Sequence, residues 1–359
     1  MQTYITVRTP LRVSFFGGGT DYPEYFATHP AAVLGMAINR YVYISALRRP
    51  AFRQHEFTIA YSQLERVNNI HDIRHPAVRV ALETFRHTSP LDISTLADLP
   101  AQSGLGSSGA FMVGLINLLS TLNDQPMTKL QMAQMAIDLE RDKLNHVCGV
   151  QDQLHAAFGG LNFFYLTKGR IRINPILMTA ERLRYFLDSL VLVFTGQTRS
   201  APVVLKEQME ATSNGALDKD LHSYYEMAQQ GVKILEEESV DSFIRTFGEL
   251  MHEGWLRKRK FSGAMTNGPI DELYEEGRKR GAYGGKLCGA GGGGFILFVV
   301  PPERREAFIS SFEPERILEV DLDMQGTTVL QSASTVVTHR NRAEEAVPAG
   351  KTAGKIAAA

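Results

Sequence analysis

Three glycine-rich segments constrain this chain more than any other feature of its sequence. They are Arg12-Val-Ser-Phe-Phe-Gly-Gly-Gly-Thr-Asp21-Tyr22, Pro100-Ala-Gln-Ser-Gly-Leu-Gly-Ser-Ser-Gly109 and Lys286-Leu-Cys-Gly-Ala-Gly-Gly-Gly-Gly294. Each adjoins a short apolar stretch of the kind that forms a strand. Because glycine lets the backbone turn sharply and approach a ligand closely, these segments predict loops that pass near a bound molecule.

The central segment predicts an anion site. It lies between an expected strand at 93–96 and an expected helix at 107–122, where apolar residues recur with a helical period. A helix N-terminus carries partial positive charge and free N–H groups, which suit phosphate. Ser107 and Ser108 add hydroxyls for phosphate oxygens or a magnesium ion. The alternative is a plain turn in which a serine caps the helix.

Two nucleotide-binding patterns compete for this segment. The P-loop ends in Gly-Lys-Ser/Thr, and that lysine is missing here. The dinucleotide pattern GxGxxG is spelled by Gly104, Gly106 and Gly109. However, the helix runs into a second helix near 128–143, where the dinucleotide fold requires a strand ending in an acidic residue. The two serines suit a triphosphate with a metal ion better than a pyrophosphate alone.

The other two segments also suggest contacts with a ligand. In the first, Arg12 can stabilise an anion and Asp21 can accept hydrogen bonds from substrate hydroxyls, although a hairpin turn with an Asx cap is the alternative. The third segment precedes the apolar strand Phe295–Val300, which favours a rigid loop over a bare linker.

Length and composition bound the class of protein. The 359 residues correspond to about two domains, and a formal charge of −1 excludes recruitment to nucleic acid or a membrane by overall charge. No signal peptide or spanning run is visible, and two cysteines are too few for a disulfide framework, so we expect a cytoplasmic globular protein.

We expect strands at 3–8, 12–16, 32–48, 56–61 and 93–96, followed by helices at 107–122, 128–143 and 151–158. Further strands are expected near 161–166, 189–194, 294–300 and 326–332, long helices over 200–280 and a helix at 302–311. Strands thus dominate the first third and helices the middle, which predicts an α+β chain. Its expected domains are 1–180 and 181–340, followed by a disordered tail at 341–359.

In their order along the chain, the three segments resemble the motifs of the GHMP kinases, the superfamily of galactokinase, homoserine kinase, mevalonate kinase and phosphomevalonate kinase. Pro100–Ala110 resembles the phosphate-binding motif, Lys286–Gly294 the C-terminal glycine motif, and Arg12–Tyr22 the galactokinase signature. The resemblance covers about residues 5–335. It implies a two-domain fold with a left-handed βαβ crossover in the N-terminal domain, against the usual handedness, and a ferredoxin-like C-terminal domain. It also implies an ATP-dependent phosphotransferase with an alcohol acceptor.

Within that superfamily the chain is most similar to the sugar 1-kinases of the D-glycero-D-manno-heptose 7-phosphate kinase group. Besides the first glycine segment, the similarity rests on the stretches 149–153, 158–162, 195–199 and 252–258. Galactokinases have Glu and His where this chain has Gly18 and Gly19, and we expect the two small residues to leave room at the far end of the sugar. The implied substrate is the heptose 7-phosphate. A fucokinase-like enzyme for an unphosphorylated sugar and an inactive ligand-binding protein are the alternatives.

The resemblance also implies roles for individual residues. Asp152 and Arg12 would be catalytic, with Asp152 orienting the attacking hydroxyl, while Ser108 and Glu140 would bind magnesium. From the residues alone, Asp152 is equally a helix cap and Glu140 a solvated helix charge. The residues expected to bind ATP are Pro100, Ser103, Gly104, Leu105, Gly106, Ser107, Ser108 and Gly109. Those expected to bind the sugar or its phosphate are Gly18, Gly19, Thr20, Asp21, Arg199, Lys258, Gly291 and Gly292.

Lys258 is the member of the basic run 257–260 that we expect to turn inward. His146, His155 and His252 show no paired metal-ligand spacing, so packing or surface roles are expected for them. The partner is expected to be a small sugar or sugar phosphate, with no nucleic acid or membrane. The sequence leaves the oligomeric state open, a homodimer included.

Overall fold

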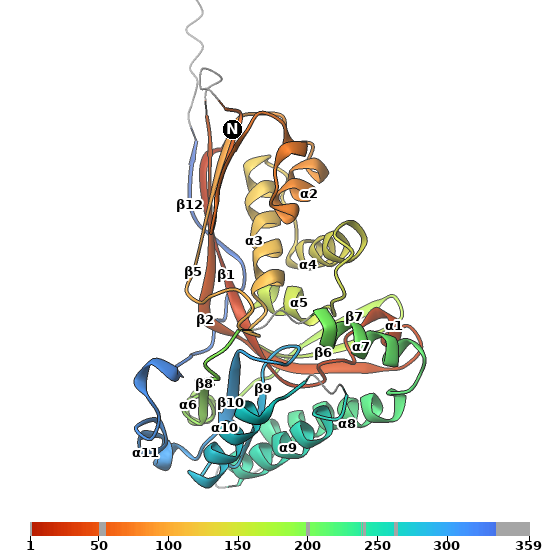
Figure 1. The fold of residues 1–359 in the computed structure, drawn as a ribbon, viewed down its shortest axis with the longest axis vertical. Coiled ribbons are helices and arrows are strands. Elements are labelled where there is room, and N and C mark those ends of the chain that lie inside the picture. The colour runs from red at the N-terminus through yellow and green to blue at the C-terminus, as the bar shows by residue number, and fades with distance from the viewer. Residues whose placement is uncertain are drawn as a thin grey trace, which may run out of the picture.

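The computed structural model describes residues 2–49, 55–198, 202–237, 239, 242–261 and 265–334. These residues form two sheets with helices packed against them (Figure 1). The predicted tail at 341–359 and the predicted site residue Arg199 lie outside the described residues. No helix in the described ranges has the length and apolar character needed to cross a bilayer.

The first sheet has the strand order β12-β1-β2-β5-β3-β4, and β6 joins it by pairing with β2 and with β7. Its strands are β1 (Gln2–Phe16), β2 (Ala31–Arg48), β3 (Phe57–Ala60), β4 (Leu64–Val67), β5 (Leu91–Ala97), β6 (Leu161–Thr167), β7 (Arg170–Pro175) and β12 (Thr328–Ser334). The long strand β2 pairs with β6 through residues 31–36 and with β5 through residues 42–48. The two ends of β2 therefore pair with different strands of the sheet.

The second sheet contains β8 (Leu190–Phe194), β9 (Gly284–Leu287), β10 (Phe295–Val299) and β11 (Ile317–Leu318). Its order is β11-β8-β10-β9 and all of its pairs are antiparallel. In chain order this is the 4-1-3-2 arrangement of a βαββαβ unit, so the predicted ferredoxin-like C-terminal part of a two-domain α+β fold is confirmed.

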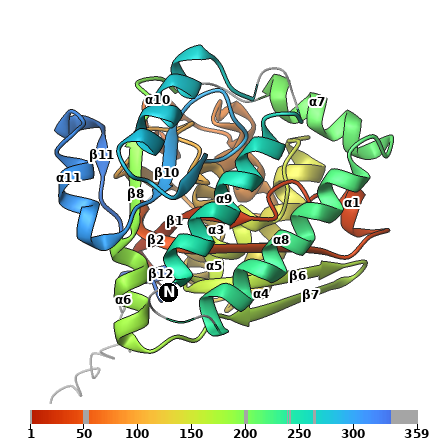
Figure 2. The same ribbon diagram turned by 90° about the horizontal axis from the view of Figure 1, so that it is seen from below.

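The helices form two groups along the chain. Those before β6 are α1 (Pro23–Phe26), α2 (Pro76–Thr84), α3 (Ser107–Leu122), α4 (Lys129–Asp138), a π-helical turn (Leu139–Lys143) and α5 (Gln151–Phe158). The later ones are α6 (Ala180–Asp188), α7 (Pro202–Ser213), α8 (Asp218–Glu237), α9 (Phe243–Lys258), α10 (Gly268–Lys279) and α11 (Arg305–Ile309), with single 3₁₀ turns at Ile70–Asp72, Pro302–Arg304 and Pro314–Arg316. Figure 1 shows α2, α3 and α4 along one face of the long strands. Figure 2 shows α8 and α9 crossing β1 and β2 from below.

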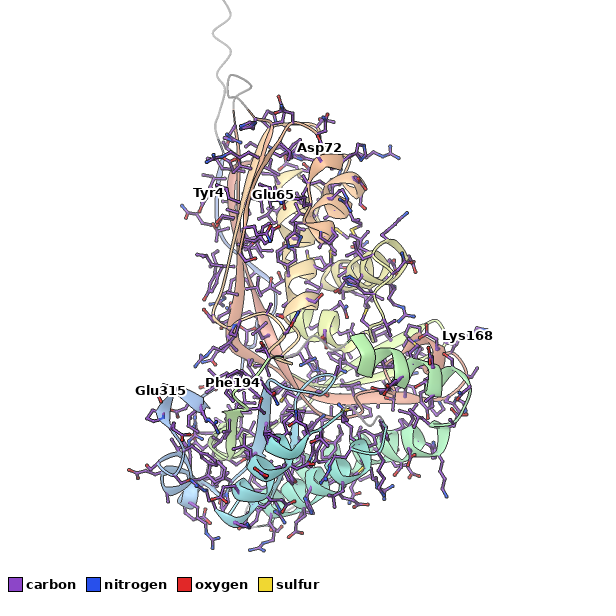
Figure 3. All side chains as sticks on the ribbon, in the orientation of Figure 1. Tyr4, Glu65, Asp72, Lys168, Phe194 and Glu315 are labelled. Carbon is purple, nitrogen blue, oxygen red and sulfur yellow. The ribbon has the colours of Figure 1, made fainter. Side chains whose placement is uncertain are left out.

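Both halves share one apolar core at the lower end of β1. Phe15 packs edge to face against Phe186 of α6 and Phe247 of α9, and Phe16 also packs against Phe247. Figure 3 places Tyr4 far up the long strands, whereas Phe194 lies in the lower part. The apolar end of β1 therefore anchors the second sheet to the first.

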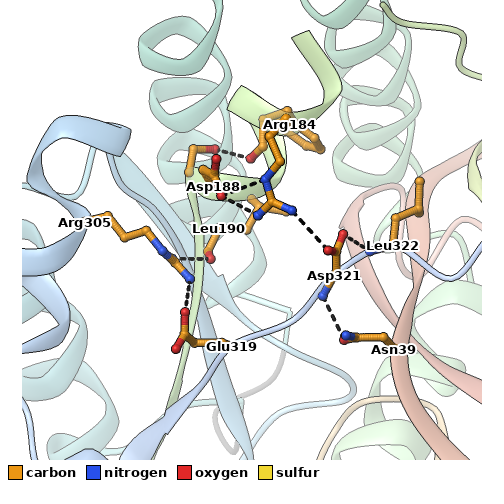
Figure 4. A network of polar contacts seen from close by, with 10 residues as sticks. Asn39, Arg184, Asp188, Leu190, Arg305, Glu319, Asp321 and Leu322 are labelled. Carbon is orange, nitrogen blue, oxygen red and sulfur yellow. Dashed lines mark hydrogen bonds and ion pairs between the residues drawn. The ribbon is translucent and has the colours of Figure 1, made fainter. Parts of the chain in front are cut away.

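A polar network completes this junction (Figure 4). Arg184 of α6 forms ion pairs with Asp188 and Asp321, and the backbone N–H of Asp321 donates to Asn39 Oδ1 of β2 at 2.8 Å. Nearby, Arg305 of α11 donates to the Leu190 carbonyl at 3.1 Å and pairs with Glu319. The helices on the second sheet are thus tied to the middle of β2.

Several elements differ from the sequence expectations. Strands expected at 3–8 and 12–16 form the single strand β1, in which the pairing with β2 shifts register between Pro10 and Leu11 because proline has no N–H to donate. The helix expected at 128–143 becomes π-helical at Leu139, and the helix expected at 302–311 divides into a 3₁₀ turn and α11. β12 falls within the predicted second domain, 181–340, yet pairs with β1 in the first sheet.

Candidate functional site

The central and C-terminal glycine segments touch through their main chains. A Cβ on Gly104 would lie 2.6 Å from the Cys288 carbonyl oxygen, and one on Gly294 would lie 2.3 Å from the Ser103 carbonyl oxygen. Gly289 faces Gly104 in return, with its hypothetical Cβ 2.7 Å from the Gly104 Cα. Only glycine fits at these contacts. The two segments, about 185 residues apart in the chain, therefore form one rigid double loop.

This double loop presents the N-terminus of α3. Gly106 is the N-cap residue and has the left-handed φ of +79°, a conformation that glycine adopts without strain. It brings no side-chain oxygen to cap the helix, so the first turn with Ser107 and Ser108 can offer its N–H groups to an anion. The Leu105 carbonyl accepts a hydrogen bond from the Arg12 backbone at 2.9 Å, which fixes the loop to β1. Pro100 is exposed at the start of the segment.

Arg12 joins the loop to α5. Its side chain is buried, and its Nε donates to Asp152 Oδ1 at 2.8 Å while Nη1 donates to the Gly104 carbonyl at 2.6 Å. Asp152 lies in the first turn of α5 and keeps 29% of its side chain exposed. Gly109 of α3 allows α5 to approach, because a Cβ there would lie 2.8 Å from the Asp152 Cβ. The structure thus brings the two predicted catalytic residues into one ion pair, in which the Asp152 side chain is partly exposed.

Asp21 is a buried cap for α5. Its carboxylate accepts the Gly19 N–H at 2.9 Å, the Gln151 N–H at 3.2 Å and the Gln151 side-chain amide at 3.3 Å. Burial raises the pKa of Asp21, and the nearby charge of Asp152 adds to that increase, whereas the backbone hydrogen bonds oppose it. The helix has no capping side chain of its own, so Asp21 determines where α5 begins. Thr20 is buried and donates to the Gly17 and Ala32 carbonyls, which holds the loop shape.

Gly18 and Gly19 differ in a way that the sequence did not predict. A Cβ on Gly18 would make only ordinary contacts, the nearest at 3.5 Å to Gln151 Nε2. The expectation of open space at Gly19 is wrong, because a Cβ there would lie 2.6 Å from Gln208 Nε2 of α7. The φ of +110° at this position also favours glycine. The buried Gln208 side chain fills the place that a residue 19 side chain would take.

Glu140 and Ser108 meet at the first turn of α3. Ser108 Oγ donates to Glu140 Oε1 at 2.5 Å, and the Gln153 amide donates to the other carboxylate oxygen. Glu140 is almost completely buried in the π-helical turn, so it is not a solvated charge. Burial raises the pKa of Glu140, although both hydrogen bonds act in the opposite direction. One hydroxyl and one carboxylate oxygen are a suitable pair for a hard cation that takes its other ligands from phosphate and water.

Two buried lysines lie behind these loops. Lys258 turns inward as predicted: its Nζ donates to the Gly289 carbonyl at 2.9 Å, and burial lowers the pKa of its amine to about 8. Lys286, in β9, was not singled out from the sequence. Its Nζ donates to the Phe15 carbonyl at 3.4 Å, and burial lowers its pKa well below the ordinary lysine value. The available signal was a single lysine between Gly284-Gly285 and Leu287-Cys288, directly before the glycine run.

Gly291 and Gly292 lie against Met265, not against the residues described so far. Both have positive φ, and the Gly292 N–H donates to the Met265 carbonyl at 2.9 Å.

His155 and His252 behave as packing residues, whereas His146 is exposed on the surface. His155 is fully buried against Phe164, burial lowers its pKa to about 3, and His252 bonds Tyr274 at 2.7 Å. Within the part of the chain that the structure describes, no group of three or more His, Cys, Asp or Glu side chains could hold a metal.

Comparison with known proteins adds independent information. Residues 74–160 match the family described as GHMP kinases N terminal domain, and residues 235–315 match GHMP kinases C terminal. The chain is 28% identical over 331 residues to the D-glycero-alpha-D-manno-heptose 7-phosphate kinase of Campylobacter jejuni, covering 87% of this chain and 94% of that protein. It is 26% identical to the galactokinase of Thermotoga maritima over 81% of this chain and 88% of that protein.

The solved structures agree on the fold. The crystal structure of a D-glycero-D-manno-heptose 1-phosphate kinase from Bacteroides thetaiotaomicron matches with a TM-score of 0.73 at 23% identity, covering 92% of this chain and all of that one. A Lactococcus lactis galactokinase complexed with galactose matches with a TM-score of 0.67 at 17% identity, over 91% of this chain and 94% of that one.

Proposed function

The chain belongs to the GHMP kinase family, and from that premise we propose that it phosphorylates the anomeric hydroxyl of D-glycero-D-manno-heptose 7-phosphate. It is an ATP-dependent sugar kinase, as its named relatives are. The reaction would move the γ-phosphoryl group of ATP to the sugar and yield the 1,7-bisphosphate. The observation that carries this proposal is the Arg12–Asp152 ion pair, whose open side lies next to the uncapped N-terminus of α3.

Phosphoryl transfer depends mainly on positioning and on neutralising charge. In the proposed reaction the first turn of α3 binds the phosphates of ATP through its N–H groups. Asp152 accepts a hydrogen bond from the attacking hydroxyl and orients it, and Arg12 balances the negative charge that gathers between them. Arg12 also bonds the Gly104 carbonyl, so the same side chain fixes the phosphate loop and the catalytic carboxylate.

We assign magnesium to Ser108 and Glu140. Their contact of 2.5 Å fits a cation site beside the phosphate loop, because both oxygens already point at one place. When bound there, the ion would neutralise phosphate charge. The Gln153 amide would keep the second oxygen of Glu140 in position.

The sugar is assigned to the side of Asp21 and Gly18, with its distal phosphate near Lys258. Gly18 leaves room there, and Lys258 Nζ lies 3.9 Å from the position of its hypothetical Cβ. Arg199, which lies outside the described residues, is proposed as a second phosphate ligand on the resemblance alone. We also propose a domain boundary near residue 180, ahead of the second sheet.

A matched pair of sugars tests the assignment. Steady-state kinetics would compare the heptose 7-phosphate with the same heptose lacking the phosphate, using ATP consumption as the readout. Lys258→Ala and Arg199→Ala are each expected to raise KM for the phosphorylated sugar about tenfold or more, since a charge-assisted contact contributes about 1.5–3 kcal/mol. The unphosphorylated sugar should be unaffected. Equal losses for both sugars would overturn the phosphate assignment and favour a kinase for an unphosphorylated sugar.

A further inference from the structure

Two buried amines repel each other electrostatically, and their side chains come from different elements. Lys258 ends α9, Lys286 lies in β9, and they are 5% and 4% exposed. Each ammonium has three donors. Among the described residues, Lys258 uses one on the Gly289 carbonyl at 2.9 Å, and Lys286 uses one on the Phe15 carbonyl at 3.4 Å. The described residues therefore leave most of the hydrogen-bonding capacity of the two amines unused, in a place that is nearly closed to solvent.

The charges around the two amines are not balanced by the protein. The ionisable groups that face one or both of them come from β1, the loop after it, α5 and the end of β9: Arg12, Asp21, Asp152 and Cys288. Asp152 is already paired with Arg12, and the oxygens of Asp21 are occupied by the N–H groups of Gly19 and Gln151. Neither lysine forms an ion pair with a carboxylate of the described residues. Burying a charged group without a partner is costly, which suggests that a ligand supplies the missing negative charge.

Unsatisfied polar atoms converge on the same place. A Cβ at Gly18 would lie 3.8 Å from Ser14 Oγ and 3.9 Å from Lys258 Nζ. Ser14 Oγ is buried and has no hydrogen-bond partner among the described residues, and the same holds for Gln151 Oε1. These atoms lie around Gly18, the one glycine of the first segment at which an added Cβ would make only ordinary contacts.

We propose that Lys258, Lys286 and Ser14 form a subsite for a phosphate ester next to Gly18. A phosphate dianion carries two negative charges and three acceptor oxygens, which matches two ammonium groups and one hydroxyl. This inference rests on the proposed function in one respect, namely that the phosphate belongs to the sugar. The γ-phosphate of the nucleotide is the other source of the same chemistry, and the test separates the two.

The subsite has a consequence for proton binding. Burial, together with repulsion from neighbouring cations, lowers the pKa of Lys258 to about 8 and the pKa of Lys286 well below the lysine norm. A bound dianion favours the charged form of both amines and so raises both pKa values. At pH 8.5 the binding of a phosphate ester should therefore take up protons, whereas the binding of a neutral sugar should not.

Calorimetric titration without nucleotide tests the proposal. The probes are heptose 7-phosphate, unphosphorylated heptose and inorganic phosphate, each measured at pH 8.5 in Tris and in HEPES so that proton uptake appears as a difference in enthalpy. Lys286→Met is expected to weaken both phosphate probes about tenfold or more and to abolish most of the proton uptake. Lys286→Arg should retain most of the affinity. Lys129→Met is the matched control, because the Lys129 amine also bonds backbone carbonyls, those of Phe158 and Gln325, but on the surface.

The outcomes are separable. A separate titration uses the non-hydrolysable analogue AMP-PNP with magnesium. If Lys286→Met weakens the binding of AMP-PNP and leaves that of the sugar phosphate unchanged, the amine serves the nucleotide and the assignment to the sugar is overturned. If no probe changes while the melting temperature falls, Lys286 is a structural residue and the subsite does not exist. If the heptose phosphate is not turned over but inorganic phosphate still binds through Lys286, the proposed substrate fails and the subsite stands.

Discussion

Asp152 combines a fixed position with an accessible carboxylate. Replacing it with Asn keeps an oxygen that can accept the hydrogen bond from Arg12 Nε, now at 2.8 Å, but removes the charge. We expect kcat to fall about 10²–10⁴-fold, with little change in nucleotide affinity. The measurement is steady-state kinetics beside a nucleotide titration. Asp142→Asn, which changes an exposed carboxylate nearby, is the control and should be neutral. Near-normal turnover of Asp152→Asn would show that Asp152 is not the catalytic carboxylate.

Glu140 gives a prediction about pH. Burial raises the pKa of Glu140, so the folded protein favours the protonated carboxyl over the ionised one. The stability that the protonated carboxyl contributes is therefore lost as pH rises through the folded pKa. Glu140→Gln should therefore stabilise the magnesium-free protein relative to wild type at neutral pH, and the gain should shrink as pH falls toward 5. Gln153 can turn its amide to accept from the new side chain, because its Oε1 has no partner among the described residues.

The two readouts for Glu140→Gln are urea unfolding in EDTA between pH 5 and 8 and the magnesium dependence of turnover. We expect the magnesium requirement to rise about tenfold or more, since a carboxylate ligand is replaced by a neutral one. A gain in stability without any change in the magnesium requirement would contradict the metal assignment.

Single residues show where sequence reasoning works and where it stops. A local pattern predicts the phosphate loop, namely the glycines at 104, 106 and 109 with the serines beside them. This loop lies at the start of a helix, as predicted. The contact between Arg12 and Asp152 joins residues 140 positions apart, and no local pattern carries it. The same limit applies to Gln208, which occupies the space expected at Gly19. Lys286 was overlooked because burial of a lysine depends on the whole fold.

At the level of elements, α5 depends on a cap from another part of the chain. Asp21 supplies that cap, and Gly149 makes room for it, because a Cβ on Gly149 would lie 1.9 Å from Asp21 Oδ2. Gly149→Ala should displace the carboxylate and the start of α5 together. We expect a loss of about 1–3 kcal/mol of stability from overpacking and a larger relative loss of kcat/KM. Thermal unfolding and kinetics measure the two effects.

Gly268→Ala is the matched control for that change. Gly268 begins α10, and a Cβ there meets nothing within 4 Å. This variant should keep both stability and activity. If Gly149→Ala behaves in the same way, the dependence of α5 on Asp21 is wrong.

Elements were predicted well where a sequence period and a stop signal agree. The bounds of α3 and α5 coincide with the expectation, because glycines precede α3 and follow α5. The short strands β4, β7, β9 and β11 and the helices α2 and α6 were not expected, since in segments this short tertiary packing outweighs local propensity. The π-helical turn at Leu139 was also missed. It places Glu140 toward Ser108, and such turns are set by tertiary contacts more than by residue type.

At the scale of the whole molecule, the shared aromatic core predicts one cooperative unfolding transition. Phe247 contacts Phe15, Phe16 and Phe186, so it holds both sheets. Phe247→Ala should lower stability by about 3–5 kcal/mol. The single tryptophan, Trp255, lies in α9 and reports on the second half by fluorescence, whereas far-ultraviolet circular dichroism reports on the whole chain. The two curves should coincide for wild type and for the variant. Separate midpoints in wild type would show that the halves unfold independently.

The pairing of β1 with β12 bears on how the chain acquires its fold during synthesis. Residues 2–8 pair with residues 328–334, so β1 acquires this neighbour only after both sheets have been translated. Until then one edge of β1 offers unpaired N–H and C=O groups for some 320 residues of elongation, and contacts this distant in sequence form slowly. The newborn chain is therefore expected to need protection from association with other chains at this edge, a requirement that the finished enzyme no longer shows.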